Sequence, residues 1–580
     1  MPQRKNIPDL TYLTFDPGSQ LIKDEALRVA KYAVTLFSVD EGMNEWKMYL
    51  NNQAEATKEF VMGHIPPLLL ETFLKNAVMV GICESIITKK QQFSPMVDKR
   101  KFSFELNAIS KFCNLLVHPQ RRALDLDLVP LDIRTRLYGS LTGFQALHTL
   151  ILGSGSGGWL PEAYSDLFLS ALPRFNRLRH FSLKYDCTEI VLKVLSETCS
   201  QSLRVLDIER SLQVKNQMCV NHILTFTDLI ELNIFKTGLQ DSEICQILVA
   251  LNNIKHLPRG DFLCEALEYL DDELSLDIKF KIQEFWASED YFFHTEEQML
   301  LVAKYCPGIR KAMFMFRDDS CKDMLILSNF NYLRDLDLWG GKFYTDRIFD
   351  FLQSCGHQLE KLSLVHVEEV DKRAVATITS TCTKLEGLGF HNTEFIDDIA
   401  SSEEDEAFRD ADRIKRQESE REIKELLQPM LDLHTITIVS DCSADLLTFI
   451  LSFCLNVKHI ALGMHTEISD NVLENVLQNN RLAKLETISI QKADKNLTTN
   501  GIELLILNCE NLKALKDPTC FEGVSENEVN ILKLRIREEN LDLMIEDEPE
   551  KVRDPSSAEL TRGILNRSGY PKVENFFNSS

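Results

Sequence analysis

The sequence predicts an α/β solenoid, a horseshoe of stacked repeats with parallel strands on the concave face and helices on the convex face, preceded by an N-terminal helical region. Three observations predict this fold: a recurring apolar triplet, a nearly constant step between triplets, and a capped helical pattern after each one. The triplet has the form L-x-x-L-x-L and follows a cysteine, as in Cys355 with Leu359, Leu362 and Leu364. A fixed repeat period indicates a fold more reliably than any single element does.

The period lies in the range of leucine-rich repeats, because most steps between triplets are 24 to 28 residues long. Two steps break this period. Ile254 to Ile309 spans 55 residues, so a repeat there is either cryptic or replaced, and Leu385 to Leu433 spans 48 residues and contains a charged insertion. The triplets begin at Leu147, Leu178, Leu203, Leu229, Ile254, Ile309, Leu333, Leu359, Leu385, Leu433, Val457, Leu485 and Leu512.

Each triplet is followed by the pattern of a capped helix. A polar pair such as Ser469-Asp470, Thr345-Asp346 or Asp241-Ser242 comes after the strand. Side chains of these types satisfy the free N–H groups at a helix start. Apolar residues at helical spacing follow, as in 472–477 (VLENVL). One strand and one helix per repeat stack into a curved array.

The chain divides into three predicted regions. Residues 1–125 do not follow the period and read as helices, so they form either a separate helical head or a cap that covers the first repeat. Residues 126–540 form the solenoid, with an acidic insertion at 396–427 whose first part we expect to be disordered. Residues 541–580 form an acidic, disordered tail.

Composition excludes several classes of function. A net charge of -24 argues against a protein that grips nucleic acid or an anionic membrane through a basic face. The 15 cysteines include no C-x-x-C pair, so we expect neither a disulfide framework nor a zinc site, but small buried side chains in reducing conditions. We find no catalytic constellation, metal site or cofactor motif, and therefore predict a non-enzymatic protein. The N-terminus carries no apolar signal segment, which predicts a cytoplasmic or nuclear location.

Strand alternation predicts which side chains face a partner. The three leucines of a triplet point into the core, and positions 3, 5 and 7, counted from the first leucine, point onto the concave face. Trp339 and Phe235 are aromatic residues expected to be exposed there, and Asp335 and Asp337 beside Trp339 would suit a basic partner segment. The predicted binding residues are Trp339, Asp335, Asp337, Glu231, Asn233, Phe235, His180, Lys184 and His391.

The repeat resembles the cysteine-containing repeats of the F-box/leucine-rich-repeat proteins, most closely in 345–364 (TDRIFDFLQSCGHQLEKLSL) and 371–390 (DKRAVATITSTCTKLEGLGF). The resemblance covers about residues 140–520. It implies that the repeats bind a substrate protein and that N-terminal helices dock the Skp1 adaptor of a cullin-RING ubiquitin ligase. The stretch 64–82 is the best candidate for an F-box, although the usual downstream tryptophan is missing. Its candidate docking residues are Pro66, Leu69, Leu70, Phe73 and Leu74.

A second docking pattern is an elongin-binding helix of the kind that related ligase receptors use. Ala108, Ile109, Cys113 and Val117 echo its small-Leu-x-x-x-Cys-x-x-x-aliphatic form, with Ala and Ile in place of the usual Ser or Thr and Leu. Two hypotheses therefore stay open. The chain is either a substrate receptor of a ubiquitin ligase or a binding scaffold unrelated to ubiquitin, whose N-terminal helices only cap the solenoid. An exposed apolar patch on residues 1–125 would favour the first hypothesis.

Overall fold

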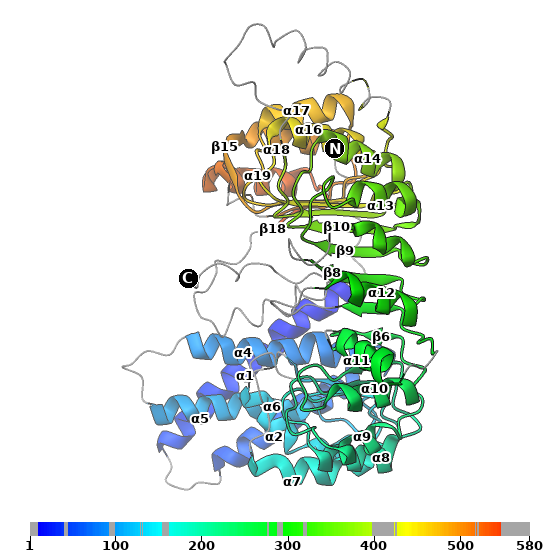
Figure 1. Cartoon of the computed structure of the whole chain (residues 1–580). Helices are drawn as coiled ribbons and strands as arrows, with labels where there is room; N and C mark the ends of the chain where they lie inside the picture. Colours follow the sequence, from blue (N-terminus) through cyan, green and yellow to red (C-terminus); the bar gives the residue numbers. More distant parts are fainter. Residues whose placement is uncertain are drawn as a thin grey trace. The chain divides into compact units, whose positions relative to one another are not determined.

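The structure of the chain is a computed structural model (Figure 1). The chain forms two compact units. Their main spans are residues 7–253, the N-terminal unit, and residues 254–550, the C-terminal unit, and each is described by itself. The structure describes residues 10–546 except 40–44, 66, 92–98, 128, 130, 153–161, 261, 275–277, 287–293, 317–321, 397–420, 422, 424–425, 517 and 519–520.

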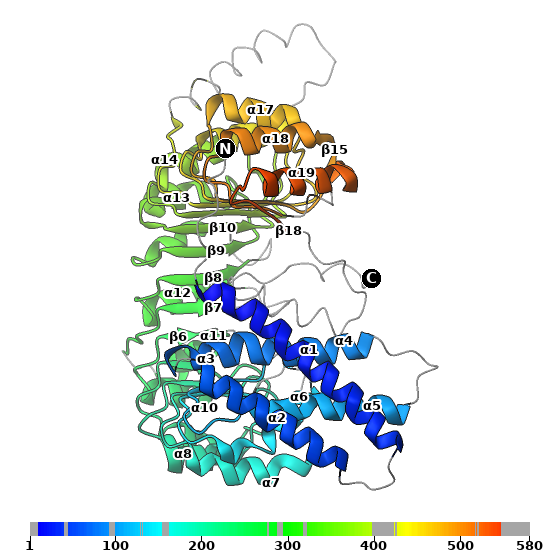
Figure 2. The same cartoon turned by 180° about the vertical axis from the view of Figure 1, so that it is seen from behind.

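The N-terminal unit begins with the predicted helical region. The first helix, α1, packs against α2, α4 and α5 (Figure 2), and its buried side chains include Ala26, Val29 and Ala33. The region consists of α1 (Leu10–Val39), α2 (Glu45–His64), α3 (Pro67–Phe73), the π-helical segment η1 (Leu74–Met79), α4 (Val80–Gln91), α5 (Lys99–Ser110) and the 3-10 helix η2 (Lys111–Leu116).

Five parallel strands follow in the N-terminal unit, and neighbours in sequence are neighbours in the sheet. The strands are β1 (Ala123–Asp125), β2 (Thr149–Ile151), β3 (His180–Ser182), β4 (Val205–Asp207) and β5 (Glu231–Asn233). The elements that alternate with them are α6 (Leu131–Tyr138), η3 (Leu141–Gly143), α7 (Glu162–Ala171), η4 (Leu172–Arg174), α8 (Glu189–Cys199), α9 (Gln217–Ile223) and α10 (Asp241–Ala250).

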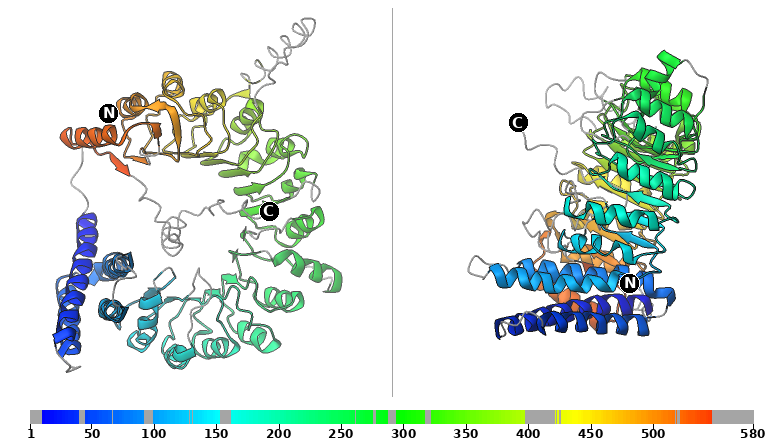
Figure 3. Two further views of the ribbon diagram at one scale, coloured as in Figure 1. Left: turned by 90° about the vertical axis from the view of Figure 1, so that its left-hand side faces the viewer. Right: turned by 90° about the horizontal axis from the view of Figure 1, so that it is seen from below.

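The C-terminal unit repeats the same alternation, with its strands on one side and its helices on the other (Figure 3). Its main sheet holds β6 (His256–Leu257), β7 (Glu284–Trp286), β8 (Lys311–Met315), β9 (Asp335–Trp339), β10 (Lys361–Val365), β11 (Gly387–His391), β12 (Thr435–Val439), β13 (His459–Leu462), β14 (Thr487–Ile490), β16 (Ala514–Lys516) and β18 (Met544–Glu546), while β15 (Ala493–Thr498) pairs with β17 (Phe521–Gly523). Its helices are α11 (Leu263–Tyr269), η5 (Leu270–Leu274), α12 (Glu296–Tyr305), η6 (Met324–Asn329), α13 (Ile348–Cys355), η7 (Gly356–Gln358), α14 (Lys372–Thr381), α16 (Ala444–Phe453), α17 (Asp470–Asn479), α18 (Thr499–Asn508) and α19 (Glu526–Glu538).

The parallel strand order and the in-register pairing confirm the predicted α/β solenoid of leucine-rich repeats. The predicted core positions are buried in most of the described repeats. In the repeat of β10, for example, Leu359, Leu362 and Leu364 are at most 2 % exposed. Leu362 and Leu364 point away from the face that carries positions 3, 5 and 7, because successive strand residues point to opposite sides, and Leu359 is buried just before the strand begins. The apolar triplet is therefore the continuous core of each unit.

The cysteine that precedes a strand is a buried side chain, as predicted, with Cys355 as a half-buried exception. Burial raises the pKa of the thiols of Cys199, Cys382, Cys454 and Cys509 to about 12. These thiols therefore stay protonated and pack as small hydrophobes. Among the thirteen cysteines in the described parts of the chain, all are free thiols.

The predicted helix caps are confirmed in part. The Ser469 hydroxyl accepts the N–H of Val472 at the start of α17, as expected. The N-cap of α10 is Gln240, which shares a capping box with Glu243, in place of the predicted pair Asp241-Ser242. The pair Thr345-Asp346 does not cap α13: its cap is Arg347 in a left-handed conformation, and the Thr345 hydroxyl donates to the Glu369 carboxylate of the next repeat.

The structure contains two repeats that the triplet pattern did not define. The long step from Ile254 to Ile309 holds a cryptic repeat, in which Ile282 and Phe285 take the first two leucine positions of β7. An earlier repeat contains β1, where the register pairs Ala123 with Thr149 and so places Arg121 at the first leucine position. Arg121 is 3 % exposed, and its guanidinium donates to the carbonyl oxygens of Leu116 and Ala123. A buried arginine therefore replaces a leucine in the first repeat.

The acidic insertion (396–427) and the acidic tail (541–580) were expected to contain disordered segments. Residues 397–420 and 547–580 lie outside the described residues, so that expectation stays a prediction. Just before the first of these segments, the Ile396 N–H donates to the Val370 carbonyl oxygen. Just before the second, β18 ends at Glu546.

His294 is fully buried among three phenylalanine rings of the C-terminal unit. Its ring centroid lies 5.6 Å from that of Phe285, 5.7 Å from that of Phe314 and 6.2 Å from that of Phe316. Its Nδ1 atom lies 3.1 Å from the backbone of Met315. Burial lowers the pKa of His294 to about 4 and outweighs the effect of this hydrogen bond. The folded protein therefore keeps the imidazole neutral at acid pH values at which the unfolded chain protonates it.

We predict that His294 lowers stability at acid pH. The imidazole in the unfolded chain binds a proton below about pH 6.5, whereas the folded one does so only near pH 4. The free energy of unfolding therefore falls as the pH drops through this window. Denaturant titrations at both ends of the window should show His294→Phe losing up to roughly 3 kcal/mol of this dependence. His465→Gln is the control, because the His465 side chain is 68 % exposed. An unchanged pH dependence in His294→Phe would contradict the prediction.

Candidate protein-binding surface

The candidate surface is the strand-lined face of each unit, formed by positions 3, 5 and 7 of the repeats. The strands pair without a shift in register, so equal positions form rows across the sheet. Position 5 of β3, β4 and β5 aligns Ser182 with Asp207, and Asp207 with Asn233. In the C-terminal unit the same row aligns Met313 with Asp337, and Asp337 with Ser363.

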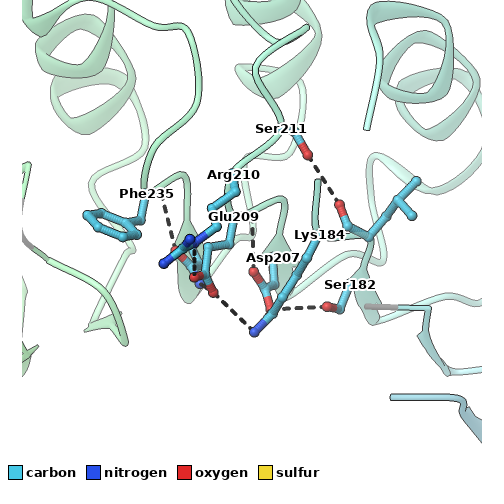
Figure 4. Close-up of polar contacts among 9 residues, drawn as sticks. Ser182, Lys184, Asp207, Glu209, Arg210, Ser211 and Phe235 are labelled. Atoms are coloured by element: carbon cyan, nitrogen blue, oxygen red, sulfur yellow. Dashed lines mark hydrogen bonds and ion pairs between the residues drawn. The ribbon is translucent and has the colours of Figure 1, made fainter. Parts of the chain in front are cut away.

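On the N-terminal unit this face carries a connected polar group, which we call the Lys184 cluster. It contains Ser182, Lys184, Asp207 and Glu209, which Figure 4 labels, together with Asn233. The Lys184 Nζ atom lies 3.5 Å from an oxygen of Asp207 and 3.1 Å from an oxygen of Glu209. The Ser182 hydroxyl donates to Asp207 at 3.0 Å, and the Asn233 amide donates to Glu209 at 3.4 Å. Each charge in the cluster therefore has a partner of opposite sign within the same unit.

Lys184 is held as a cation by these two carboxylates. Burial by itself would lower the pKa of its ammonium group, but Asp207 and Glu209 outweigh burial and raise that pKa. Lys184 and Asn233 were both predicted as partner-binding residues. Lys184 binds Asp207 and Glu209, and the Asn233 amide donates to Glu209. A partner would have to displace these internal contacts to bind Lys184 or Asn233.

Phe235 is 4 % exposed, so the expectation that it is an exposed aromatic is wrong. The reason is that β5 ends at Asn233, whose side-chain oxygen accepts the Phe235 N–H at 3.2 Å. Strand alternation therefore does not extend to position 7 of this repeat. The Lys236 ammonium, one residue later, lies 5.4 Å from the centre of the Phe235 ring.

The remaining two predicted residues of the N-terminal unit lie at position 3 of their strands. Glu231 in β5 and His180 in β3 are both half-buried. Burial lowers the pKa of His180, and the carboxylates of Asp207 and Asp125 offset part of that effect. Position 3 of this unit therefore remains accessible to a partner.

In the C-terminal unit, position 3 of five successive strands carries an alternating row that we call the charge ladder: His256, Glu284, Lys311, Asp335 and Lys361. The Glu284 carboxylate lies 3.0 Å from His256 Nδ1 and 2.9 Å from Lys311 Nζ. The Lys361 Nζ atom lies 4.0 Å from an Asp335 oxygen. Asp335, a predicted binding residue, thus belongs to a ladder in which opposite charges already alternate.

Asp337 lies at position 5 of the same strand, and its environment differs from that of Asp335. It is 8 % exposed, and in the described parts of the chain it forms no ion pair. Burial and then the neighbouring Asp335 carboxylate raise the pKa of Asp337 to about 7, against the opposite effect of a hydrogen bond from Ser363. In the described residues of the C-terminal unit, the strand-lined face therefore holds a buried carboxyl group, Asp337, without a cation.

Trp339 lies at position 7 of the repeat, as the last residue of the regular five-residue strand β9, and is half-buried. Its neighbours in register are Met315 and Val365, and its ring centroid lies 6.1 Å from that of His366. The chain turns sharply after it. Gly340 has a φ of 81°, and a Cβ atom there would clash with the Phe316 carbonyl oxygen.

His391 takes the same position 7 two strands further on, in β11, and is half-buried. Its ring lies over Gly389, because a Cβ atom on that glycine would be only 2.9 Å from His391 Nε2. Burial lowers the pKa of His391. Trp339 and His391 are thus brought into one row, with Val365 between them.

The candidate adaptor-docking residues do not form one exposed face. Pro66 lies outside the described residues, Leu69 is exposed, and Leu70 is half-buried. Phe73 and Leu74 are buried, so the expectation that they face an adaptor is wrong. The reason is packing within the helical region: a Cβ atom on Gly18 of α1 would lie 2.8 Å from the Phe73 ring.

Most residues of the elongin-like pattern are likewise buried in the interior of the helical region. Ala108, Ile109 and Cys113 are at most 2 % exposed, and the chain from Lys111 to Leu116 forms a 3-10 helix. A docking helix would need to present these side chains to the adaptor. The simpler interpretation, an amphipathic helix with a buried cysteine, is therefore the one that the packing supports.

Sequence reasoning missed the cations of the charge ladder, Lys311 and Lys361, and the small residues beside Asp337, Ser363 and Gly389. The sequence could have predicted these residues, because all of them occupy positions 3 or 5 of aligned repeats. Reading each row across the strands, rather than each strand along its length, would have found them.

We predict that Lys184 stabilises the N-terminal unit by compensating two acidic side chains. Lys184→Met should leave Asp207 and Glu209 close together without a cation and lower the free energy of unfolding by about 1–3 kcal/mol, since the lysine is partly exposed. Thermal unfolding of the full chain measures this loss. Lys193→Met, on the exposed side of α8, is the matched control. A triple variant that adds Asp207→Asn and Glu209→Gln should recover most of the stability, and failure to recover would refute the electrostatic explanation.

The comparisons with known proteins add little to this description. No protein-family model matches the chain, and no curated protein matches its sequence. Among solved structures, a leucine-rich-repeat protein of Leptospira interrogans is similar, with 14 % sequence identity, a TM-score of 0.34, and an alignment that covers 76 % of this chain and 92 % of that one. A TM-score this low does not by itself establish a shared fold. The leucine-rich-repeat assignment therefore rests on the parallel strand order, the register and the buried triplets of this chain.

Proposed function

We propose that the chain is the substrate-recognition subunit of a cullin-RING (SCF-type) ubiquitin ligase, in which the strand-lined face of the C-terminal unit receives the substrate protein. The observation that supports this binding surface is Trp339, a half-buried indole at the carboxyl end of β9, with Met315 and Val365 beside it in the sheet. Partly exposed tryptophans are favoured anchors of protein interfaces. In the described parts of the chain no three metal-ligating side chains cluster, and no helix is long and apolar enough to cross a membrane.

The ubiquitin part of the proposal has two supports. The first is the resemblance of the cysteine-containing repeats to those of F-box/leucine-rich-repeat proteins. The second is a set of exposed apolar side chains on the helical region, where Leu21 and Tyr32 of α1 and Phe60 of α2 are each at least 50 % exposed. Leu21 and Tyr32 lie three helical turns apart and so share a face of α1. The Tyr32 ring lies 5.0 Å from that of Tyr49 in α2, which continues this face across both helices.

We place this function in the cytoplasm or nucleus. The thirteen described cysteines are free thiols, and twelve of them are buried, as expected of a protein that folds in a reducing compartment.

A second candidate function is a binding scaffold whose helices cap the solenoid. One observation favours it. The Glu71 carboxylate in α3 accepts the backbone N–H groups of Arg122 and Ala123, at 3.2 and 3.3 Å. These groups lie at the first strand of the sheet, where an uncovered edge would expose them. This capping contact uses α3, whereas the exposed apolar face lies on α1 and α2, so both roles fit within one helical region.

The strand-lined face is tested by partner capture. Trp339→Ala combined with Asp335→Ala should weaken binding of a captured protein at least tenfold, because truncating an interface tryptophan removes a large contact. Calorimetry with the purified partner measures the change, and thermal unfolding checks that the array still folds. Tyr332→Ala is the matched control, since Tyr332 is a 59 % exposed aromatic in the turn before the same strand. A partner that binds the double variant as tightly as the parent would show that the site lies elsewhere.

The adaptor role is tested by a pull-down of the full chain, scored for Skp1, the elongins and cullins. The parent chain should capture an adaptor, and Leu21→Asp combined with Tyr32→Asp should lose it, because a charge on an apolar contact face is costly to bury. Lys31→Asp, at an exposed position next to Tyr32, is the control and should retain capture. Failure of the parent chain to capture any adaptor would leave the scaffold as the remaining function.

A further inference from the structure

On the strand-lined face of the C-terminal unit, the acidic side chains of the charge ladder are compensated by nearby cations, as Asp207 and Glu209 are in the N-terminal unit. Among the carboxyl groups whose pKa burial raises, two form no ion pair in the described residues: Asp127 after β1, whose environment includes Lys184, and Asp337 in β9. Asp207 and Glu209 bind Lys184, Glu284 binds His256 and Lys311, and Asp335 lies next to Lys361. Asp337 lies among these residues, yet in the described residues no cation is within ion-pair distance of it. Because a buried carboxylate without a cation is costly, this position is arranged to accept a positive charge from outside.

The side chains around Asp337 define the shape of the group that fits there. The neighbouring position 5 residue on β10 is the small Ser363, and beyond it the His391 ring lies over Gly389 on β11. On one side lies the charge ladder, with Lys361 half exposed, and on the other lies the Trp339 row. Asp337 is thus recessed between two rows of larger side chains, and an incoming cation must be long enough to reach between them.

We propose that Asp337 and Trp339 together receive an arginine side chain from a basic segment of the partner protein, with the guanidinium group paired to the carboxylate and stacked on the indole. This inference rests on the proposed function, since it names the chemistry of the partner at that surface. Arginine fits better than lysine for two reasons. Its planar guanidinium stacks on aromatic rings, and it is more weakly hydrated than an ammonium group, so it is less costly to bury.

The acidity of Asp337 is consistent with this role. Burial and the nearby Asp335 raise the pKa of Asp337 to about 7 in the isolated chain. The charged groups that act on this carboxyl are Asp335 on its own strand and Lys361 on β10. Lys361 lies 4.0 Å from Asp335, and Lys311 on β8 pairs with Glu284 at 2.9 Å. A guanidinium group at Asp337 would supply the compensation that those lysines give to Glu284 and Asp335.

The test uses the purified full-length chain and a positional-scanning array of synthetic peptides. Each peptide position carries in turn arginine, citrulline, lysine or leucine, and citrulline has nearly the shape of arginine without its charge. We expect one position at which arginine binds about tenfold more tightly than citrulline, the effect of one well-placed charge pair. Asp337→Asn should reduce this preference to about twofold or less, because it removes the charge but keeps the size of the side chain.

Matched variants identify what each result means. Asp335→Asn should keep the arginine preference, because Asp335 already lies beside Lys361 in the charge ladder. Trp339→Leu should weaken arginine binding more than citrulline binding, because a cation interacts with an aromatic ring more strongly than a neutral group does. Asp337→Asn should unfold at the same temperature as the parent or higher, because it replaces a buried acid with a neutral amide, and this result confirms that the variant folds.

The inference and the proposed function fail in different ways. If peptides bind, and Trp339→Ala abolishes their binding, but arginine is not preferred or the preference survives in Asp337→Asn, the inference is wrong and the binding surface stands. If the peptides that bind are unaffected by Trp339→Ala, or none bind, both the inference and the placement of the surface are wrong.

Discussion

Unbroken parallel register within each unit is the constraint on which the rest of this structure depends. A one-residue slip would send every core side chain to the solvent face, so the buried triplets hold each strand to its neighbours. In the C-terminal unit, Leu336 pairs with Leu362, and Leu362 with Leu388, without a shift. A position in the repeat is therefore also a location on the sheet. Charged side chains that are far apart in the sequence are therefore aligned in rows across the sheet. This is why Lys311, Asp335 and Lys361 lie side by side.

The rows differ in how their charges are balanced, and this difference separates structural residues from candidate binding residues. In the Lys184 cluster every ionised group binds another in the same unit, so the cluster mainly supports the fold. The charge ladder alternates in sign and is likewise balanced internally. Asp337 differs because its neighbours along the row are Met313 and Ser363, neither of which carries a charge. A chain that leaves one buried acid uncompensated loses stability there, and a partner can recover that loss.

The fold could be predicted from the sequence because the signal is periodic, and the errors occurred where the period is interrupted. Leu359, Leu362 and Leu364 follow the pattern and are buried. Arg121 breaks it, because a guanidinium with two carbonyl acceptors replaces a leucine. The site was harder to predict, since exposure depends on how far each strand extends. The five-residue strand β9 includes Trp339 at position 7, whereas the three-residue strand β5 stops at Asn233 and leaves Phe235 to fold inward.

The helical region shows why a cap and a docking module are compatible roles. A sheet edge needs its backbone groups covered, and Glu71 provides this at Arg122 and Ala123 with a single side chain. That contact occupies α3 and leaves the outer face of α1 and α2 free of the sheet. Apolar side chains such as Leu21 and Phe60 gain nothing for the fold by remaining exposed on that face. We therefore propose α1 and α2 as the docking face for an adaptor, in place of the stretch 64–82 that the sequence favoured.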